Sequence, residues 1–321
     1  MNISKNSFLH LQSTTKEGIQ WLNENRFILQ TNFLLSEGLK SEIFKEYLKQ
    51  TQLKQLSWLA EFKNIISNLN KAKLTFIPFK GPTLSYMLYS EWNCRQFRDL
   101  DFIFPDANSL IAAITVLEEI GYRPVYKLLP HQVEKYFLFQ KDIKLQKPGT
   151  PFLLEFHLKL LPGSLRDKIM TEDVFSSKKT IETELGRISI PDTNVLIKYL
   201  FFHGEVHQWQ RLHWLYDFLK LYETRSKSHI RLPEERIEEL RNVFTQLSVS
   251  EIKNGKHQNE YPSLKSLNQT KMEIFAFKNS FFYPSGEFIL SNSKLNSKQI
   301  KREWFFWRLK DVAKKSINRL I

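Results

Sequence analysis

The chain has 321 residues, with 47 lysines and arginines against 34 aspartates and glutamates, so its formal net charge is +13. Hydrophobic residues make up 42% and charged residues 25% of the chain, which is typical of a folded protein and excludes a disordered one. None of the ten glycines are spaced as G-x-G-x-x-G or G-x-x-x-x-G-K-[ST], which excludes a Rossmann fingerprint and a Walker A loop. Any phosphate chemistry must therefore use metal ions and side chains.

The cysteine content and the hydropathy pattern indicate the compartment. Cys94 is the single cysteine, so the chain can form no internal disulfide, which suits a reducing environment. The N-terminal residues lack the apolar centre of a signal peptide, and no run of about 18 apolar residues suggests a membrane span. We therefore expect a cytoplasmic protein.

Three regions are expected from the spacing of apolar residues. Residues 1–71 have helical spacing and predict an N-terminal helical segment, with a long helix at 40–70 and a shorter one near 15–35. Residues 72–190 contain short β-rich runs between helical ones and predict the core of the protein. Residues 191–321 return to helical spacing.

The central region predicts a small mixed β-sheet, hence an α+β or α/β fold with helical N- and C-terminal extensions. Residues 181–190 are consistent with one further strand beyond four clearer ones. The clearer strands are expected at 74–79, 98–105, 136–146 and 152–161, and the helices at 81–89 and 107–120.

The C-terminal region predicts helices at 193–206, 208–223 and 233–247, followed by a polar stretch at 248–263 that is expected to be a mobile linker. Residues 294–321 contain nine lysines and arginines against two acidic residues and are expected to form a basic terminal helix. Such a helix could contact an anionic membrane or nucleic acid, but packing on the body of the protein is favoured over both.

Three acidic residues stand out in the central region. Asp99 and Asp101 flank Leu100 at the start of a strand, so their side chains point the same way. Glu155 interrupts an otherwise apolar strand, where an unpaired carboxylate would be costly. Each feature alone also fits a solvated surface. Together the three carboxylates form the set that two metal ions need for phosphoryl or nucleotidyl transfer.

Several stretches in a fixed order also carry a family resemblance. They are FKG at 79–81, R-x-x-R-D-L-D-F at 95–102, E-F-H at 155–157, and HGEVHQWQRLHWLYDF at 203–218. With these stretches the chain resembles the uncharacterised nucleotidyltransferase family of the DNA polymerase beta-like superfamily. The resemblance implies a reaction that depends on Mg²⁺, with two ions, and moves a nucleoside monophosphate from an NTP to an acceptor hydroxyl.

The resemblance also implies roles for individual residues. Asp99, Asp101 and Glu155 would be the catalytic metal ligands. Lys80 and Gly81 would lie where the superfamily has a Gly-Ser turn that contacts phosphate, although this chain has Lys-Gly-Pro there.

The residues around these motifs have two interpretations each. Arg95 and Arg98 could bind the triphosphate or form salt bridges with the neighbouring aspartates. His157 could orient Glu155 or be a structural histidine. His203 and His207 are four residues apart on an expected helix and could bind zinc, but HGEVH is not H-E-x-x-H, so a structural or cleft-lining role is favoured. Arg211 and Asp217 could close over the nucleotide or acceptor, or could pack in the core as a buried polar pair.

Two other functions remain open from the sequence. One is a nucleotide-binding or regulatory protein of the same fold that does not turn over. The other is an RNA-directed transferase or an RNA-binding protein, suggested by the basic aromatic C-terminus. The sequence does not indicate whether the acceptor is a small molecule, a glycan, a peptide or a protein, nor which base is preferred, nor the oligomeric state.

Overall fold

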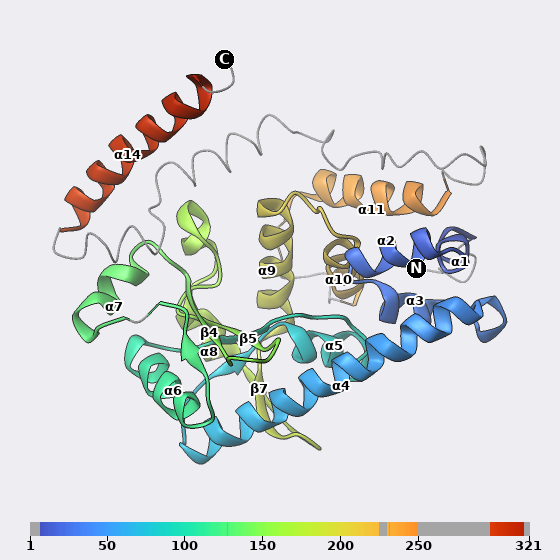
Figure 1. The fold of residues 1–321 in the computed structure, drawn as a ribbon, viewed down its shortest axis with the longest axis horizontal. Helices are drawn as coiled ribbons and strands as arrows, with labels where there is room; N and C mark the ends of the chain where they lie inside the picture. Colours follow the sequence, from blue (N-terminus) through green and yellow to red (C-terminus); the bar gives the residue numbers. More distant parts are fainter. Residues whose placement is uncertain (1–6, 127, 225–229, 231, 250–295, 318–321) are drawn as a thin grey trace.

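The computed structural model describes residues 7–126, 128–224, 230, 232–249 and 296–317 (Figure 1). The N-terminal region is helical, with α1 (Ser7–Gln12), α2 (Lys16–Glu24), α3 (Ile28–Leu34) and the long α4 (Glu42–Lys71), and a 3₁₀ turn at Glu37–Leu39. Ser41 caps α4 by accepting a hydrogen bond from the Phe44 N–H, so the helix expected at 40–70 is confirmed. The helix expected near 15–35 is two helices, because Arg26 has a left-handed backbone with φ 53°.

The five-stranded sheet has the order β1-β2-β5-β4-β3. Strands β2 and β5 are parallel and every other neighbouring pair is antiparallel, which confirms the mixed sheet. The strands are β1 (Ile77–Pro78), β2 (Leu100–Ile103), β3 (Arg123–Pro124), β4 (Asp142–Gln146) and β5 (Leu153–His157).

Two expected strands differ in the structure. The strand expected at 136–146 begins only at Asp142, because α7 (Pro130–Phe137) extends into that range. A turn follows, in which the N–H groups of Phe139 and Gln140 donate to the carbonyl of Tyr136. Residues 181–190 belong to a separate two-stranded hairpin of β6 (Lys179–Thr183) and β7 (Gly186–Ile190). Its turn uses Gly186 at φ 102°, a conformation that glycine adopts without steric cost.

The remaining helices surround the sheet. The helix expected at 107–120 is confirmed as α6 and is followed by Gly121 at φ 94°. The helix expected at 208–223 begins only at Leu212, because Gln208 and Trp209 have left-handed backbones. The helices are α5 (Gly81–Tyr89), α6 (Ala107–Glu119), α8 (Thr171–Ser177), α9 (Thr193–Val206), α10 (Leu212–Glu223), α11 (Glu234–Val249) and α14 (Ser297–Ile317), with a 3₁₀ helix at Gly163–Lys168.

The buried apolar side chains form two clusters. One joins α1–α3 to α9, α10 and α11, which gather on one side of the sheet in Figure 1. The other joins α4 and α6 to the sheet and to β7. The N-terminal helices α1–α3 and the helices α9–α11 therefore share one core. The division of the chain at residues 71 and 190 stays a prediction.

The terminal helix α14 lies beside α7 in Figure 1, and its Lys301 ammonium lies 5.9 Å from the centre of the Phe139 ring. Ile300 and Trp304 are buried, whereas Phe306 and Trp307 are exposed. The linker expected at 248–263 lies outside the described residues from residue 250 onward. In the described part of the chain, no helix combines the length and the apolar character that crossing a membrane requires.

Candidate functional site

Two neighbouring parallel strands bring the central carboxylates together. In the register of β2 and β5, Asp101 is paired with Glu155. Along β2 the side chains alternate, so Leu100 and Phe102 enter the core while Asp101 points to the opposite face. The sequence places Glu155 on a strand neighbouring that of Asp101, and the register sets these two residues side by side.

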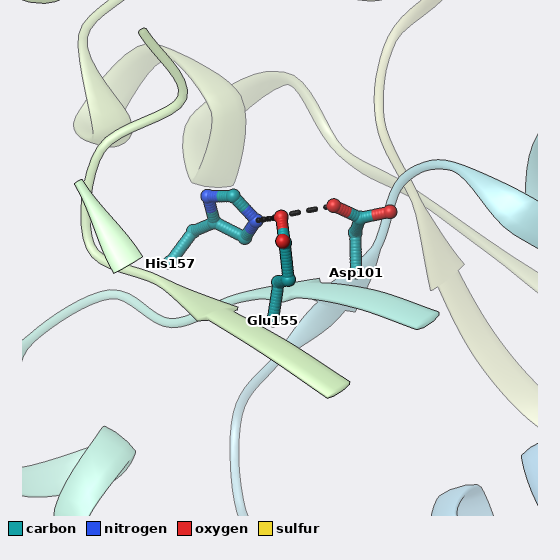
Figure 2. Close-up of side chains that lie close together, drawn as sticks. All are labelled: Asp101, Glu155 and His157. Carbon is teal, nitrogen blue, oxygen red and sulfur yellow. Dashed lines mark hydrogen bonds and ion pairs between the residues drawn. The ribbon is translucent and has the colours of Figure 1, made fainter. Parts of the chain in front are cut away.

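His157 completes a cluster with these two acids. Within the described residues, Asp101, Glu155 and His157 form a group whose ligand atoms all lie within 4.8 Å of one another. His157 Nε2 lies 3.2 Å from Asp101 Oδ1 and 3.7 Å from Glu155 Oε2. Figure 2 shows the three side chains rising from the same side of the two strands and pointing toward one another.

The donor atoms of this cluster fit a divalent cation. Asp101 is buried, and its Oδ2 has no hydrogen-bond partner in the described part of the chain. Burial lowers the pKa of His157 to about 3, so the imidazole is neutral and a ring nitrogen can act as a ligand. Two carboxylates and a neutral imidazole suit Mg²⁺ or Mn²⁺.

A lysine already supplies positive charge to this cluster. Lys80 Nζ lies 2.6 Å from Asp101 Oδ1. Burial alone would lower the pKa of Lys80, but Asp101 and the acids around it raise that pKa well above its ordinary value, so the side chain is charged. Lys80 lies two residues after β1 and is the N-cap of α5. The next residue, Gly81, begins α5 with φ 51°, and a Cβ added there would lie 3.5 Å from the carbonyl oxygen of Asp99.

Strand β4 and the residue just before it add two lysines that sequence reasoning missed. Lys144 is paired with Glu155 across the strands and places its Nζ 3.1 Å from Glu155 Oε1, and Lys141 Nζ lies 3.8 Å from Oε2. Burial alone would raise the pKa of Glu155, but these lysines, Lys80 and His157 hold it below its usual value. Glu155 is therefore ionised. The period-2 pattern of DIKLQ is the signal that could have placed Lys144 on this face.

Asp99 lies beside the cluster rather than within the 4.8 Å group. Burial and the nearby charge of Asp101 raise the pKa of Asp99. Arg98 next to it is exposed.

The structure places Arg95 in a different environment from Arg98. The Nε of Arg95 donates a 2.6 Å hydrogen bond to Asp217 Oδ2, and both side chains are buried. This pair ties the loop before β2 to α10. Arg95 and Asp217 are thus brought to each other and not to the carboxylate cluster.

His203, His207 and Arg211 of the last stretch lie along a row of aromatic rings. His203 lies between Tyr199 and His207, with ring centres 5.4 and 4.5 Å apart, and His207 lies 5.0 Å from Trp214. The guanidinium carbon of Arg211 is 5.2 Å from the centre of the Trp214 ring. Since Tyr199 also contacts Lys80, at 5.6 Å from its ring, the row extends from the cluster to Arg211.

Comparison with solved structures finds nucleotidyltransferases with low sequence identity. The chain is 13% identical to ANT(2'')-Ia in complex with adenylyl-2''-tobramycin, covering 59% of this chain and 98% of that one at a TM-score of 0.39. A solution structure of ANT(2'')-Ia is 14% identical over 61% and 95% of the two chains, also at 0.39. A nucleotidyltransferase-like antigenic protein from Paracoccidioides brasiliensis is 14% identical over 59% and 86%, at 0.33.

No curated protein matches the chain. A family model does: residues 34–241 match the model described as uncharacterised nucleotidyltransferase. The match spans α4, the whole five-stranded sheet, the acidic cluster and helices α9 and α10. The chain therefore belongs to the uncharacterised nucleotidyltransferase family.

Proposed function

We propose that the protein transfers a nucleoside monophosphate from an NTP to a hydroxyl group of an acceptor, with Mg²⁺ at the carboxylates. The observation that carries this proposal is the register of β2 and β5. It sets the buried Asp101 opposite Glu155 and leaves one Asp101 oxygen without a partner in the described chain.

Asp101, Glu155 and His157 would hold a first ion, and Asp99 with Asp101 a second. When bound, the ions neutralise phosphate oxygens and polarise the phosphoryl group that is attacked. Glu155 is ionised and can accept the proton of the acceptor hydroxyl. Lys80, Lys141 and Lys144 supply positive charge beside the carboxylates and would attract the triphosphate.

The proposed reaction forms one bond to phosphorus and breaks one. The acceptor oxygen forms a bond to the α-phosphorus of the NTP, and the bond from that phosphorus to the bridging oxygen of the β-phosphate breaks. Pyrophosphate leaves with the electron pair, and the hydroxyl proton passes to a base such as Glu155.

The test uses the full chain, each of four NTPs labelled at the α-phosphate, Mg²⁺, and a panel of hydroxyl compounds. Wild type is expected to release pyrophosphate and to label one acceptor class, and Asp101→Asn and Glu155→Gln are expected to lose at least about a hundredfold in rate. Asp106→Asn is the matched control, because Asp106 caps α6 and asparagine caps as well.

A folded wild type that binds Mg²⁺ and NTP but releases no pyrophosphate with any acceptor would favour a nucleotide-binding or regulatory protein of the same fold. Equal rates in wild type and in both cluster variants would show that the chemistry lies elsewhere.

A further inference from the structure

A turn outside the sheet carries an arginine that no sequence motif singled out. Arg26 lies between α2 and α3 in a left-handed conformation. The preceding residue, Asn25, is held by α10: its Oδ1 accepts a 3.0 Å hydrogen bond from the Leu212 N–H, and its carbonyl accepts one at 3.0 Å from His213 Nδ1. These two bonds fix Arg26 close to Arg211, the residue before Leu212.

The same turn is tied to the loop that leads into β2. Gln96 Oε1 accepts a 2.6 Å hydrogen bond from the Ile28 N–H, and Gln96 Nε2 donates a 3.5 Å bond to Asn23 Oδ1. Gln96 is two residues before Arg98 and three before Asp99. These hydrogen bonds on both sides of Arg26 therefore bring together three separate parts of the chain, which carry Arg26, Arg98 and Arg211.

Within the described residues, none of Arg26, Arg98 and Arg211 forms an ion pair, and Asp99 is the acid whose charge acts on Arg26. Within the same ranges their guanidinium groups make no hydrogen bond, and Arg211 contacts the face of Trp214. Arg95 differs from them, because Asp217 neutralises it. An excess of positive charge is thus held in place beside the candidate metal ligands.

The electrostatics of Arg26 agree with this arrangement. Burial is the largest effect and lowers the pKa of Arg26 to about 10, and repulsion by Arg211, Arg95 and Arg98 adds to it. Asp99 is the acid that opposes these effects. A bound anion would relieve the repulsion, and guanidinium groups match phosphate oxygens in geometry as well as in charge.

We infer that Arg26, Arg98 and Arg211 form a phosphate-binding site adjoining Asp99. This inference rests on the proposed function for the identity of the ligand, which is the triphosphate of the NTP or a phosphate group on the acceptor. In either case Arg26 and Arg211 reach the ligand from the helical regions that flank the sheet, so the site requires the N-terminal helices as well as the core.

The test measures anion binding in EDTA, without metal, NTP or acceptor, so a failure of transfer activity does not affect its outcome. Tripolyphosphate and inorganic phosphate are titrated by calorimetry into the full chain at low ionic strength. Wild type is expected to bind at least one of them, more weakly as salt rises. Arg26→Gln and Arg211→Gln are each expected to weaken binding about tenfold.

Two further variants sharpen the result. Asp99→Asn is expected to strengthen binding, because it removes a negative charge that repels the anion. Arg187→Gln is the matched control, since Arg187 lies on the exposed hairpin and should leave binding unchanged. The melting temperatures of Arg26→Gln and Arg211→Gln should stay close to that of wild type, because neither guanidinium makes a hydrogen bond within the described residues.

Competition then identifies the source of the phosphate. If Mg²⁺ and NTP displace tripolyphosphate competitively, the site holds the triphosphate; if inorganic phosphate binds together with Mg²⁺ and NTP, it holds a phosphorylated acceptor. Both results support the site. Wild-type affinity in Arg26→Gln and Arg211→Gln, or no binding of either anion to wild type, would overturn it.

Discussion

The ammonium nitrogen of Lys80 lies 2.6 Å from Oδ1 of Asp101, where 14% of the lysine side chain and none of the aspartate side chain is exposed. A full positive charge thus stands against the carboxylate that is proposed to bind Mg²⁺. In the protein without metal, Lys80 supplies the charge that Asp101 needs in order to be buried. If Mg²⁺ binds as proposed, Asp101 would carry both the lysine contact and the metal.

The first prediction concerns this pair. Lys80→Met removes the partner of a buried charge and is expected to cost about 3–5 kcal/mol of unfolding free energy in EDTA. Mg²⁺ should restore part of that loss, so the metal should stabilise the variant more than wild type. Urea denaturation with and without Mg²⁺ measures both effects. Lys45→Met, which breaks an exposed pair with Glu42, is the control and should cost under about 1 kcal/mol. A Lys80→Met protein as stable as wild type in EDTA would contradict the prediction.

The second prediction separates a structural role of Arg95 from nucleotide binding. Asp217→Asn leaves the buried guanidinium without its counter-ion and is expected to destabilise the protein by about 3–5 kcal/mol. Replacing both residues by apolar ones, as in Arg95→Met with Asp217→Leu, should cost less than the sum of the two single changes. Denaturation of wild type, Arg95→Met, Asp217→Leu and the double variant measures the coupling energy between the two side chains. If Arg95→Met instead weakens NTP binding at unchanged stability, Arg95 acts on the nucleotide.

The third prediction concerns a close contact at the end of α9. A Cβ added at Gly204 would lie 2.3 Å from the ring of Trp209, which is fully buried and donates from Nε1 to Glu205 Oε1 at 2.7 Å. Gly204→Ala is therefore expected to cost about 1–3 kcal/mol through forced movement of the ring. Gly38→Ala is the control, because no atom lies within 4 Å of its added Cβ. Denaturation curves of equal midpoint for wild type and Gly204→Ala would refute the expected clash.

The fourth prediction is a pH dependence of stability. His213 is fully buried, and burial lowers its pKa well below the ordinary value of 6.5. As the pH falls below 6.5, His213 binds a proton in the unfolded chain but stays neutral in the folded protein. The free energy of unfolding therefore decreases as the pH falls. One such group contributes up to about 1.4 kcal/mol per pH unit.

His213→Asn retains a donor for the carbonyl of Asn25 and removes the titration. The slope of unfolding free energy against pH between 6.5 and 4.5 should be shallower in the variant than in wild type. Parallel curves would show that folding does not lower the pKa of His213, which would contradict the prediction.

The features of the site that could be predicted from the sequence are those that depend on residues close together in the chain. Side chains alternate along a strand, so Asp101 lies on the face opposite to Leu100 and Phe102. Glu155 stands out because it is the single acidic residue in a short apolar strand. The order of the strands and helices follows from the same periodicities. These features can be predicted from short stretches of the sequence alone.

The rest depends on contacts between distant residues. Arg95 and Asp217 are 122 positions apart, and nothing in either local sequence shows that they form a pair. Arg26 reaches the neighbourhood of Asp99 only because Asn25 and Gln96 are bonded to other segments. The strand expected at 136–146 was too long because aromatic residues that favour strands also suit the end of a helix packed against a core.

The sheet is bounded on each side by a two-residue strand that contains a proline, Pro78 in β1 and Pro124 in β3. Proline has no N–H to donate, and so short a strand offers almost no ladder to a foreign chain. The β7 strand also lies beside β1 without joining its sheet. The sheet that carries the acidic cluster is thus closed to extension at both edges, which protects a protein with 14% aromatic residues from edge-to-edge aggregation.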